Sequence, residues 1–325
     1  MSVATLEKPS FHENTLTNRD NLEISLDEQV KKTTELVSDV AHLESRLEDV
    51  KNSVKIAVLN KNTASVEFFR NRRKQIEATI KEVKAEIQGS KYLSMLTVEH
   101  MTKLDDFMDY TEGVDREYKG DTLGTAVKVG SFAEDSAEWH EARANGIGGS
   151  DIAIIMGISP FKKRDALLKM KTGEVVQKAN NTGGAALRGH VWENYIARKF
   201  ARKNPDKTVL FSKDSWNKSG EETHKANFDG LICENGSDVP NAILEIKTAS
   251  KPQDWENGVP EYYRLQVLWY MDACGFKKGY LAVIINDADY REYEIVARDG
   301  EMEEIHAKVN AFVAEVKARK AELAA

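Results

Sequence analysis

The sequence contains little cysteine and no long apolar run. Only Cys233 and Cys274 occur among 325 residues, and neither lies in a CxxC pair or at metal-ligand spacing from a histidine. This pattern excludes a disulfide scaffold and a structural zinc site. No apolar run reaches the roughly 18 residues of a membrane-spanning helix, the N-terminus shows no apolar signal segment, and the mean hydropathy is −0.51. We therefore expect a protein of the reducing cytoplasm with no membrane partner.

Several catalytic and structural motifs are also missing. The absence of a GxxxxGKS/T loop excludes an ATP-driven helicase, and no repeat of roughly 20 to 50 residues indicates a solenoid or propeller. Ser150 has no His–Asp arrangement near it, so a serine hydrolase is not expected. His140, His190 and His224 form no His-x3-His or His–Cys pair. We expect these histidines to be structural or exposed.

The charge is unevenly distributed along the chain. Lys and Arg number 46 against 53 acidic residues, a net charge of −7, which gives no overall attraction to nucleic acid. Residues 151–218 nevertheless hold fourteen basic and six acidic residues, a local excess of +8. Such a segment is either a solvated helical face or a phosphate-binding surface.

The N-terminal part predicts one long helix after an unstructured start. Residues 1–20 mix Ser, Thr, Asn and Pro9 without periodicity and are predicted to be a disordered lead-in. The following apolar residues recur at alternating steps of four and three, the a/d spacing of a heptad. They are Leu36, Val40, Leu43, Leu47, Val50, Val54 and Ala57.

A second helix is predicted after the polar turn at residues 60–63. Its apolar stripe has Arg73 at one apolar position and ends at Gly89 and Ser90. The stripe comprises Val66, Phe69, Ile76, Ile80, Val83 and Ile87. A short turn between two long helices predicts an antiparallel helical hairpin, with a continuous parallel coiled coil as the alternative.

A domain boundary is predicted near residue 125. Residues 92–110 form a shorter predicted helix, followed by a linker that contains Gly113, Gly120, Gly124 and Gly130. The predicted organisation is a lead-in at 1–20, a hairpin or coiled-coil extension with its linker at 21–125, and a second domain at 126–325.

The second domain is predicted to mix strands and helices. Short β-rich runs bounded by Asp, Asn, Gly or Pro occur at residues 208–211, 226–233, 242–247, 279–285 and 290–297. Predicted helices occupy residues 136–145, 151–156, 164–172, 187–204, 261–274 and 300–322. The fold class is therefore α+β, with a helical extension at the N-terminus.

The residues most indicative of chemistry are Asp229, Glu245 and Lys247. Glu245 and Lys247 follow the apolar run 242–244, and as alternate residues of a strand they share one face, whereas Ile246 enters the core. Two neighbouring carboxylates favour a divalent cation between them, and oxygen ligands suit Mg²⁺ or Mn²⁺. A lysine beside them can hold and activate an attacking water, so the pattern indicates a phosphodiesterase centre. A surface strand with a salt bridge is the alternative.

An upstream helix adds a third acid. Glu193 lies three and seven residues before Ile196 and Phe200, at the border of that helix's apolar stripe. From this position it is expected to face the metal site. Glu141 and Asp151 are alternative candidates for the same role.

Six spaced motifs follow one another in a fixed order over roughly residues 136–300. They are EWHEAR at 138–143, IGGSDIA at 147–153, WEN at 192–194, FDG at 228–230, LEIK at 244–247 and LQV at 265–267. In this order they resemble the lambda-exonuclease and YqaJ-type viral recombinase nucleases of the PD-(D/E)XK superfamily. Phe228 replaces the proline that usually precedes the superfamily's aspartate. The resemblance implies a restriction-endonuclease-like core with a central mixed sheet flanked by helices.

The resemblance also implies residue roles. Asp229, Glu245 and the Ile246 carbonyl would hold the metal with a contribution from Glu193, and Lys247 would activate water. The remaining matched positions lie near the 5′-phosphate end of the substrate strand: Arg143, Ser150 and Gln266. An Arg fork and a hydroxyl at a helix start suit a terminal phosphate. The alternative for Arg143 is a surface salt bridge with Glu138 or Glu141.

The family function implied is an Mg²⁺-dependent 5′→3′ exonuclease on linear double-stranded DNA ends in phage-type recombination. It would leave a 3′ single-stranded overhang for a single-strand annealing protein, act in the cytoplasm of a bacterial host, and assemble as a homotrimer. The sequence leaves two alternatives open. One is a PD-(D/E)XK endonuclease or nickase, and the other is a non-catalytic DNA-binding scaffold that acts through the helical hairpin.

Overall fold

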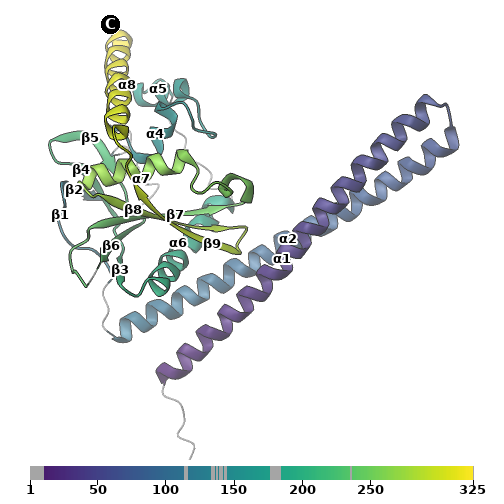
Figure 1. Cartoon of the computed structure of the whole chain (residues 1–325), viewed down its shortest axis with the longest axis horizontal. Coiled ribbons are helices and arrows are strands. Elements are labelled where there is room, and N and C mark those ends of the chain that lie inside the picture. The colour runs from purple at the N-terminus through teal and green to yellow at the C-terminus, as the bar shows by residue number, and fades with distance from the viewer. Residues whose placement is uncertain are drawn as a thin grey trace, which may run out of the picture. The chain divides into compact units, whose positions relative to one another are not determined.

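The chain divides into two compact units at residue 113, one made of two helices and one that contains the strands (Figure 1). The computed structural model describes residues 11–112, 116–132, 136, 138, 142, 145–175, 184–234 and 236–324. None of the helices within these ranges is long and apolar enough to cross a membrane.

The first unit is an antiparallel hairpin of α1 (Phe11–Leu59) and α2 (Thr63–Glu112), as predicted. The turn between them contains Lys61 in a left-handed conformation, at φ 54°. Asn62 Oδ1 accepts the backbone N–H of Ser65 at 3.1 Å, which caps the start of α2. The stripes of the two helices face each other and bury Leu26, Val40, Ala57, Ile76, Ile80, Ile87, Val98 and Met101.

Two features of the hairpin correct the sequence prediction. α1 begins at Phe11, so the predicted lead-in is helical from that residue, and residues 1–10 lie outside the described chain. The reason is a buried ion pair that carries no apolar signal: Arg19 Nε donates to Asp105 Oδ1 at 2.9 Å. α2 also continues through Gly89 and Ser90 without a break.

The continuity of α2 follows from what surrounds the two small residues. The space where a Gly89 side chain would lie is open, so glycine costs the helix only about 1 kcal/mol there. The Ser90 and Thr33 hydroxyl oxygens are 2.7 Å apart across the helix pair, which links α1 and α2 at this level.

The second unit contains two sheets. The larger has the strand order β3-β6-β7-β8-β9, with β7 and β8 parallel and every other neighbouring pair antiparallel. Its strands are β3 (Lys207–Leu210), β6 (Gly230–Glu234), β7 (Ala242–Ala249), β8 (Lys278–Ile285) and β9 (Asp289–Val296). The smaller has the order β1-β2-β4-β5. Its strands are β1 (Thr122–Leu123), β2 (Ala126–Ser131), β4 (Asp214–Lys218) and β5 (Glu221–Ala226).

The sequence prediction found the larger sheet and missed most of the smaller one. The predicted strand at 226–233 is two strands, because the chain leaves β5 after Ala226 and enters β6 at Gly230. β4 was not predicted because its polar residues Asp214, Ser215 and Asn217 are buried, which removes the usual alternation. The boundary predicted near residue 125 falls between β1 and β2.

The helices of this unit cover the larger sheet on both faces. α6 (Gly184–Lys203) packs against β7 and β8 from one side, and α7 (Glu261–Cys274) packs against the same strands from the other (Figure 1). α4 (Gly149–Ile155), α5 (Arg164–Thr172) and α8 (Glu301–Ala324) complete the helical layer. These agree with the predicted helices, whereas the one predicted at 136–145 lies mostly outside the described residues. The α+β fold class is confirmed.

Candidate active site

Asp229 and Glu245 meet because β6 and β7 are neighbours. Asp229 directly precedes β6, and Gly230 pairs with Leu244 in the antiparallel register, which places Asp229 level with the middle of β7. The Ile246 backbone N–H donates to Asp229 Oδ2 at 2.7 Å. The interruption between β5 and β6 therefore positions one carboxylate against the strand that carries the other.

Glu245 is a buried carboxylate with charged and polar neighbours. Its side chain is 1 % exposed, and its Oε1 pairs with the Lys247 ammonium. Gln266 Nε2 on α7 donates to the same oxygen at 2.5 Å. A buried carboxylate persists in ionised form only where such donors replace water. The predicted residues Asp229, Glu245, Lys247 and Gln266 are thus brought together from two strands and one helix.

Lys247 is held as a cation in this arrangement. Burial lowers the pKa of its ammonium group, but the nearby carboxylates of Glu245 and Asp229 outweigh burial, so the pKa lies above its usual value. The Lys247 Nζ also lies 5.4 Å from the centroid of the Tyr263 ring, over its face. At neutral pH the side chain is therefore a positively charged hydrogen-bond donor.

The start of α4 packs tightly against the helix that carries Gln266. A Cβ on Gly149 would lie 2.7 Å from Tyr270 Cε1 and 2.8 Å from Gln266 Cγ, so only glycine permits this approach. Ser150, the next residue, is exposed in the first turn of α4. The structure thereby brings the IGGSDIA motif next to Gln266, as the family resemblance implies. Arg143, its predicted partner in phosphate binding, lies outside the described residues.

Of the two acids considered as alternatives to Glu193, only Asp151 lies among the described residues. Asp151 caps α4 by accepting the Gly148 N–H at 3.1 Å, and its Oδ2 also lies 2.9 Å from Lys171 Nζ. It therefore has a local structural role. Glu141 lies outside the described residues.

Glu193 comes from the other side of the sheet. It is half-buried on α6, next to Trp192 and on the stripe of Ile196 and Phe200, which are fully buried. α6 and α7 cover opposite faces of β7. Glu245 is hydrogen-bonded to Gln266 on α7, whereas Glu193 lies on α6. Among the described residues, no three His, Cys, Asp or Glu side chains are grouped closely enough to hold a metal ion. The assignment of Glu193 as a ligand stays a prediction.

The oxygen atoms at β6 and β7 nevertheless suit a hard divalent cation. The carboxylates of Asp229 and Glu245 and the backbone carbonyl of Ile246, the residue after Glu245, form an all-oxygen donor set at two adjacent strands. Mg²⁺ and Mn²⁺ favour such donors and keep several water ligands of their own. The residues present therefore fit the predicted cofactor.

Two aromatic residues belong to this site although the sequence did not single them out as catalytic. The face of the Tyr263 ring is directed at Lys247, and the Tyr270 hydroxyl lies 3.4 Å from Gln266 Nε2. Both lie one helical turn from Gln266, three residues before and four residues after it, a spacing that helical periodicity makes visible. Trp269 of the same helix is a buried core residue, and its Nε1 donates to the Ile147 carbonyl at 3.1 Å.

The basic segment 151–218 is not one uninterrupted patch. Among its described residues, at least five cations form ion pairs with acidic side chains: Arg164, Lys169, Lys171, Lys207 and Lys218. The local excess of +8 is thus partly compensated within the fold.

Comparison with known proteins agrees with the motif pattern. Residues 138–277 match the family model of the YqaJ-like viral recombinase domain. This segment includes the matched motifs from EWHEAR to LQV and the whole cluster around Glu245, so the predicted resemblance is confirmed. The segment that resembles the YqaJ-like viral recombinase domain lies in the second unit of the chain.

Individual relatives cover only part of the chain. The Uncharacterized protein YqaJ of Bacillus subtilis (strain 168) is 34 % identical over 170 residues, which is 51 % of this chain and 51 % of that protein. The chain thus spans about half the length of this curated relative. The crystal structure of an alkaline exonuclease (LHK-Exo) from Laribacter hongkongensis aligns at a TM-score of 0.48 and 20 % identity, over 58 % of this chain and 96 % of that one. The same protein in complex with dAMP aligns at a TM-score of 0.47.

Proposed function

We propose that the chain is a divalent-metal-dependent deoxyribonuclease that digests linear double-stranded DNA from 5′ ends. The observation that carries the proposal is the convergence of Asp229, Glu245, Lys247 and Gln266 at one point of β6, β7 and α7, within the segment that matches the YqaJ-like viral recombinase domain. A buried acid with a lysine and an amide on one oxygen is poorly explained as a surface salt bridge.

The roles of the residues follow from their chemistry. Asp229, Glu245 and the Ile246 carbonyl would hold Mg²⁺ or Mn²⁺, which when bound supplies Lewis-acid stabilisation of charge on the phosphoryl oxygens. Lys247 is a charged donor that holds and orients the attacking water. Gln266 keeps Glu245 in place through its hydrogen bond. Glu193 is proposed to contribute from α6.

Hydrolysis requires only water as co-reactant. The water oxygen forms a bond to phosphorus, the P–O3′ bond breaks, and the departing 3′ oxygen takes a proton. The released nucleotide carries the old 5′-phosphate, and the shortened strand has a new one. Arg143 and Ser150 are proposed to bind this terminal phosphate, which directs the enzyme to ends.

The biological setting is proposed from the same domain match. Digestion in this polarity leaves a 3′ single-stranded overhang, the substrate of a single-strand annealing protein in phage-type recombination. A homotrimeric assembly and action in the cytoplasm of a bacterial host belong to this proposal.

One digestion experiment tests the proposal. Linear duplex DNA with 5′-phosphate or 5′-hydroxyl ends, and circular duplex DNA, are incubated with Mg²⁺, Mn²⁺ or EDTA. We expect metal-dependent loss of 5′-phosphorylated linear DNA, spared circles and an inactive Lys247→Ala variant. Cut circles would indicate an endonuclease instead, and no cleavage of any DNA would indicate a binding or scaffold protein.

A matched control accompanies the Lys247→Ala variant. Lys278 on β8 forms an ion pair with the buried Glu234, with Nζ 2.8 Å from the carboxylate oxygen. Lys278→Ala therefore removes a lysine from a similar pair in the same sheet. It is expected to keep the wild-type digestion rate.

A further inference from the structure

The turn end of the hairpin concentrates positive charge. Residues 51–74 contain seven basic residues, Lys51, Lys55, Lys61, Arg70, Arg72, Arg73 and Lys74, and a single acidic residue, Glu67. The whole chain carries a net charge of −7. This region, which we call the hairpin tip, is therefore opposite in sign to the rest of the protein.

Elsewhere on the hairpin, several basic residues pair with acids across or along the helices. Lys84 Nζ lies 2.7 Å from Glu44 on the opposite helix, and Lys32 Nζ lies 2.9 Å from Glu86. Such pairs help to hold α1 against α2, although each contributes little. A cation that stabilises the hairpin is therefore expected to have an acidic partner on it.

At the tip, Lys51 pairs with Glu48 on its own helix at 3.1 Å, whereas the described tip cations of α2 are mostly unpaired. Within the described part of the chain, Arg70, Arg72 and Lys74 form no ion pair, and Arg73 pairs with Glu77 on its own helix at 2.8 Å. All of residues 70–75 are exposed. Arg70, Arg72 and Lys74 therefore add charge to the tip without forming an ion pair that holds the helices together.

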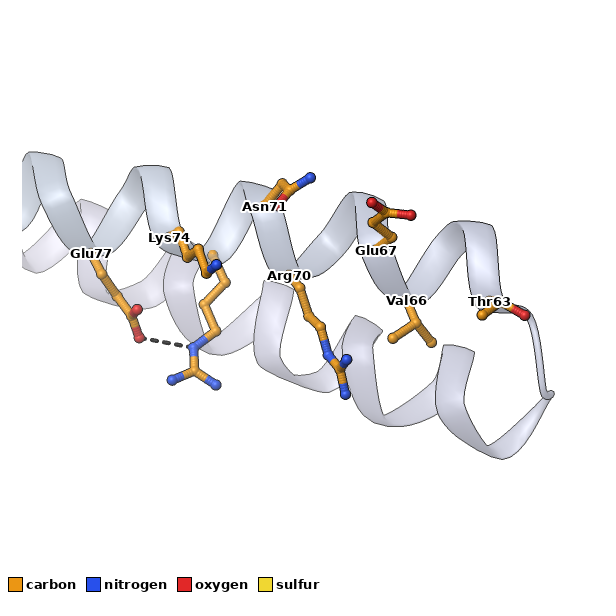
Figure 2. A pocket seen from close by; sticks show the side chains of 8 residues that line it. Thr63, Val66, Glu67, Arg70, Asn71, Lys74 and Glu77 are labelled. Atoms are coloured by element: carbon orange, nitrogen blue, oxygen red, sulfur yellow. Dashed lines mark hydrogen bonds and ion pairs between the residues drawn. The ribbon is translucent and has the colours of Figure 1, made fainter.

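A polar hollow lies along this part of α2 (Figure 2). Val66 is the one apolar side chain among its lining residues, and the others are Thr63, Glu67, Arg70, Asn71, Arg73, Lys74 and Glu77. Figure 2 shows Arg70 projecting on the same side as Val66, whereas Glu67 points away from both. Since Arg73 compensates Glu77, the side that Arg70 occupies is positive and suits an anion.

An exposed aromatic ring accompanies Arg72 on the face of α2 opposite to Arg70, since residues two apart in a helix are separated by about 200°. Phe68 is 65 % exposed and precedes Arg72 by four residues, so the ring and the guanidinium lie on the same face of α2. The Phe69 ring meets it edge-on, with centroids 5.3 Å apart, and braces it from the half-buried side. A ring beside a phosphate-binding cation is the arrangement that binds an unpaired base and its backbone together.

We propose that the hairpin tip is a second nucleic-acid site, which binds single-stranded DNA. The excess of cations selects a polyanion, and the exposed Phe68 selects a strand whose bases are free to stack. Duplex DNA offers the phosphates but hides the base faces. An apolar protein helix does not suit a hollow lined by charged and polar side chains.

The source of the strand depends on the proposed function. If the second unit digests one strand of a duplex, the remaining 3′ strand is the single-stranded DNA that the tip binds. The binding itself does not depend on that activity. The two claims are therefore tested by separate measurements.

The test compares two triple variants of the full chain that lose the same charge. One is Arg70→Ala, Arg72→Ala, Lys74→Ala at the tip. The other is Lys31→Ala, Arg46→Ala, Lys81→Ala on the remainder of the hairpin, where these three residues are also exposed. Binding of fluorescent oligothymidine and of a blunt duplex is measured by anisotropy in EDTA over a series of salt concentrations.

Loss of three phosphate contacts to a single strand is expected to reduce the slope of log affinity against log salt by about 2. At low salt, the tip variant is expected to bind oligothymidine roughly tenfold to hundredfold more weakly. The charge-matched variant is expected to keep both values. Equal losses of oligothymidine affinity in the two variants would overturn the proposal. No loss of affinity in the tip variant would also overturn it, and would leave an acidic protein segment as the ligand of the tip.

A second pair of variants tests the aromatic contribution. Phe68→Ala is expected to weaken oligothymidine binding by about fivefold or more while changing duplex binding little. The control is Tyr92→Ala, which removes a 57 % exposed aromatic ring from the same helix. Equal effects of Phe68→Ala on both DNA forms would contradict a single-strand site. If the protein does not digest duplex DNA but the tip variant binds oligothymidine more weakly than wild type, the single-strand site is supported and the proposed nuclease function is wrong.

Discussion

Gln266 on α7 and Glu245 on β7 are joined by a hydrogen bond of 2.5 Å from the amide nitrogen to Oε1. The same oxygen receives the Lys247 ammonium. Gln266 of α7 and Lys247 of β7 thus donate to the same Glu245 oxygen. The position of the buried carboxylate is therefore determined by both elements.

This link predicts that Gln266 acts by positioning Glu245. Gln266→Leu keeps the size of the side chain but removes the donor, so Glu245 gains freedom and we expect DNA cleavage to fall by about tenfold to a hundredfold. Gln266→Glu is expected to be worse, because a second carboxylate repels the first. Cleavage rates across a Mg²⁺ titration check this. A positioning role raises the Mg²⁺ concentration needed for half-maximal rate, whereas an unchanged Mg²⁺ dependence would contradict it.

Lys247→Ala is predicted to remove the charged donor of the site. We expect cleavage to fall by about 10²–10⁴-fold, the usual contribution of a positioned proton-transfer or donor group. The loss of its ammonium also leaves Glu245 buried with fewer donors, so the midpoint of thermal unfolding is expected to decrease. Activity assays and calorimetry on Lys247→Ala and Lys278→Ala distinguish the two effects. Similar activity losses in both variants would mean that the effect arises from general destabilisation.

Gly149→Ala is predicted to disturb the site through packing alone. The new Cβ would approach Tyr270 and Gln266 to within 2.8 Å, so α4 and α7 must separate. Overpacking of this kind costs about 1–3 kcal/mol, and the shift of Gln266 is expected to reduce cleavage as well. The control is Gly189→Ala on α6, where no atom lies within 4 Å and alanine favours the helix. Urea unfolding of both variants checks the prediction, and equal stabilities would refute it.

The parts of the site that the sequence predicts are those encoded by local spacing. Glu245 and Lys247 alternate on one strand after an apolar run, and Gln266 lies in a helix with clear bounds, so their types and elements follow from the sequence. Their meeting was implied by the family resemblance. The contact of Gly149 with Tyr270 was not visible, because a close approach between two helices leaves no periodic signal.

The parts of the fold that were missed depend on polar residues with distant partners. Asp214 is buried in β4, where its Oδ2 lies 2.9 Å from Lys128 Nζ on the neighbouring β2. The sequence of β4 therefore has the composition of a polar loop. Gly89 and Ser90 likewise have the composition of a helix end, although Ser90 instead contacts Thr33 in the other helix of the hairpin.

The stability of the second unit is predicted to fall in mild acid because of His224. Burial lowers the pKa of its imidazole to about 4 from 6.5. The ring stacks on Trp269 with centroids 3.6 Å apart, and Nε2 lies 3.0 Å from the Trp269 carbonyl. The charged groups that face it are Asp272, Glu221 and Lys218, and the His306 ring also lies beside it. Their combined effect does not overcome burial.

The sign follows from which state binds the proton. Below pH 6.5 the unfolded chain protonates His224 whereas the folded chain does not until about pH 4, so the free energy of unfolding decreases over this interval. The full loss is about 3 kcal/mol. Urea unfolding at pH 7, 6 and 5 checks this. His224→Phe keeps an aromatic ring against Trp269 and is expected to flatten the pH dependence, and an equally steep dependence in that variant would assign the effect to another group.

The Arg19–Asp105 pair predicts that the first turns of α1 stabilise the hairpin. The two side chains are 7 % and 10 % exposed, and Arg19 Nε lies 2.9 Å from Asp105 Oδ1. Arg19→Ala leaves a buried carboxylate without this partner, which costs about 3–5 kcal/mol. The double variant Arg19→Met, Asp105→Leu fills the site with apolar groups and is expected to recover most of the loss. Helix content and thermal unfolding followed by circular dichroism measure both. If Arg19→Ala unfolds at the same temperature as wild type, residues 11–20 do not stabilise the hairpin. That result would favour the disordered lead-in predicted from the sequence.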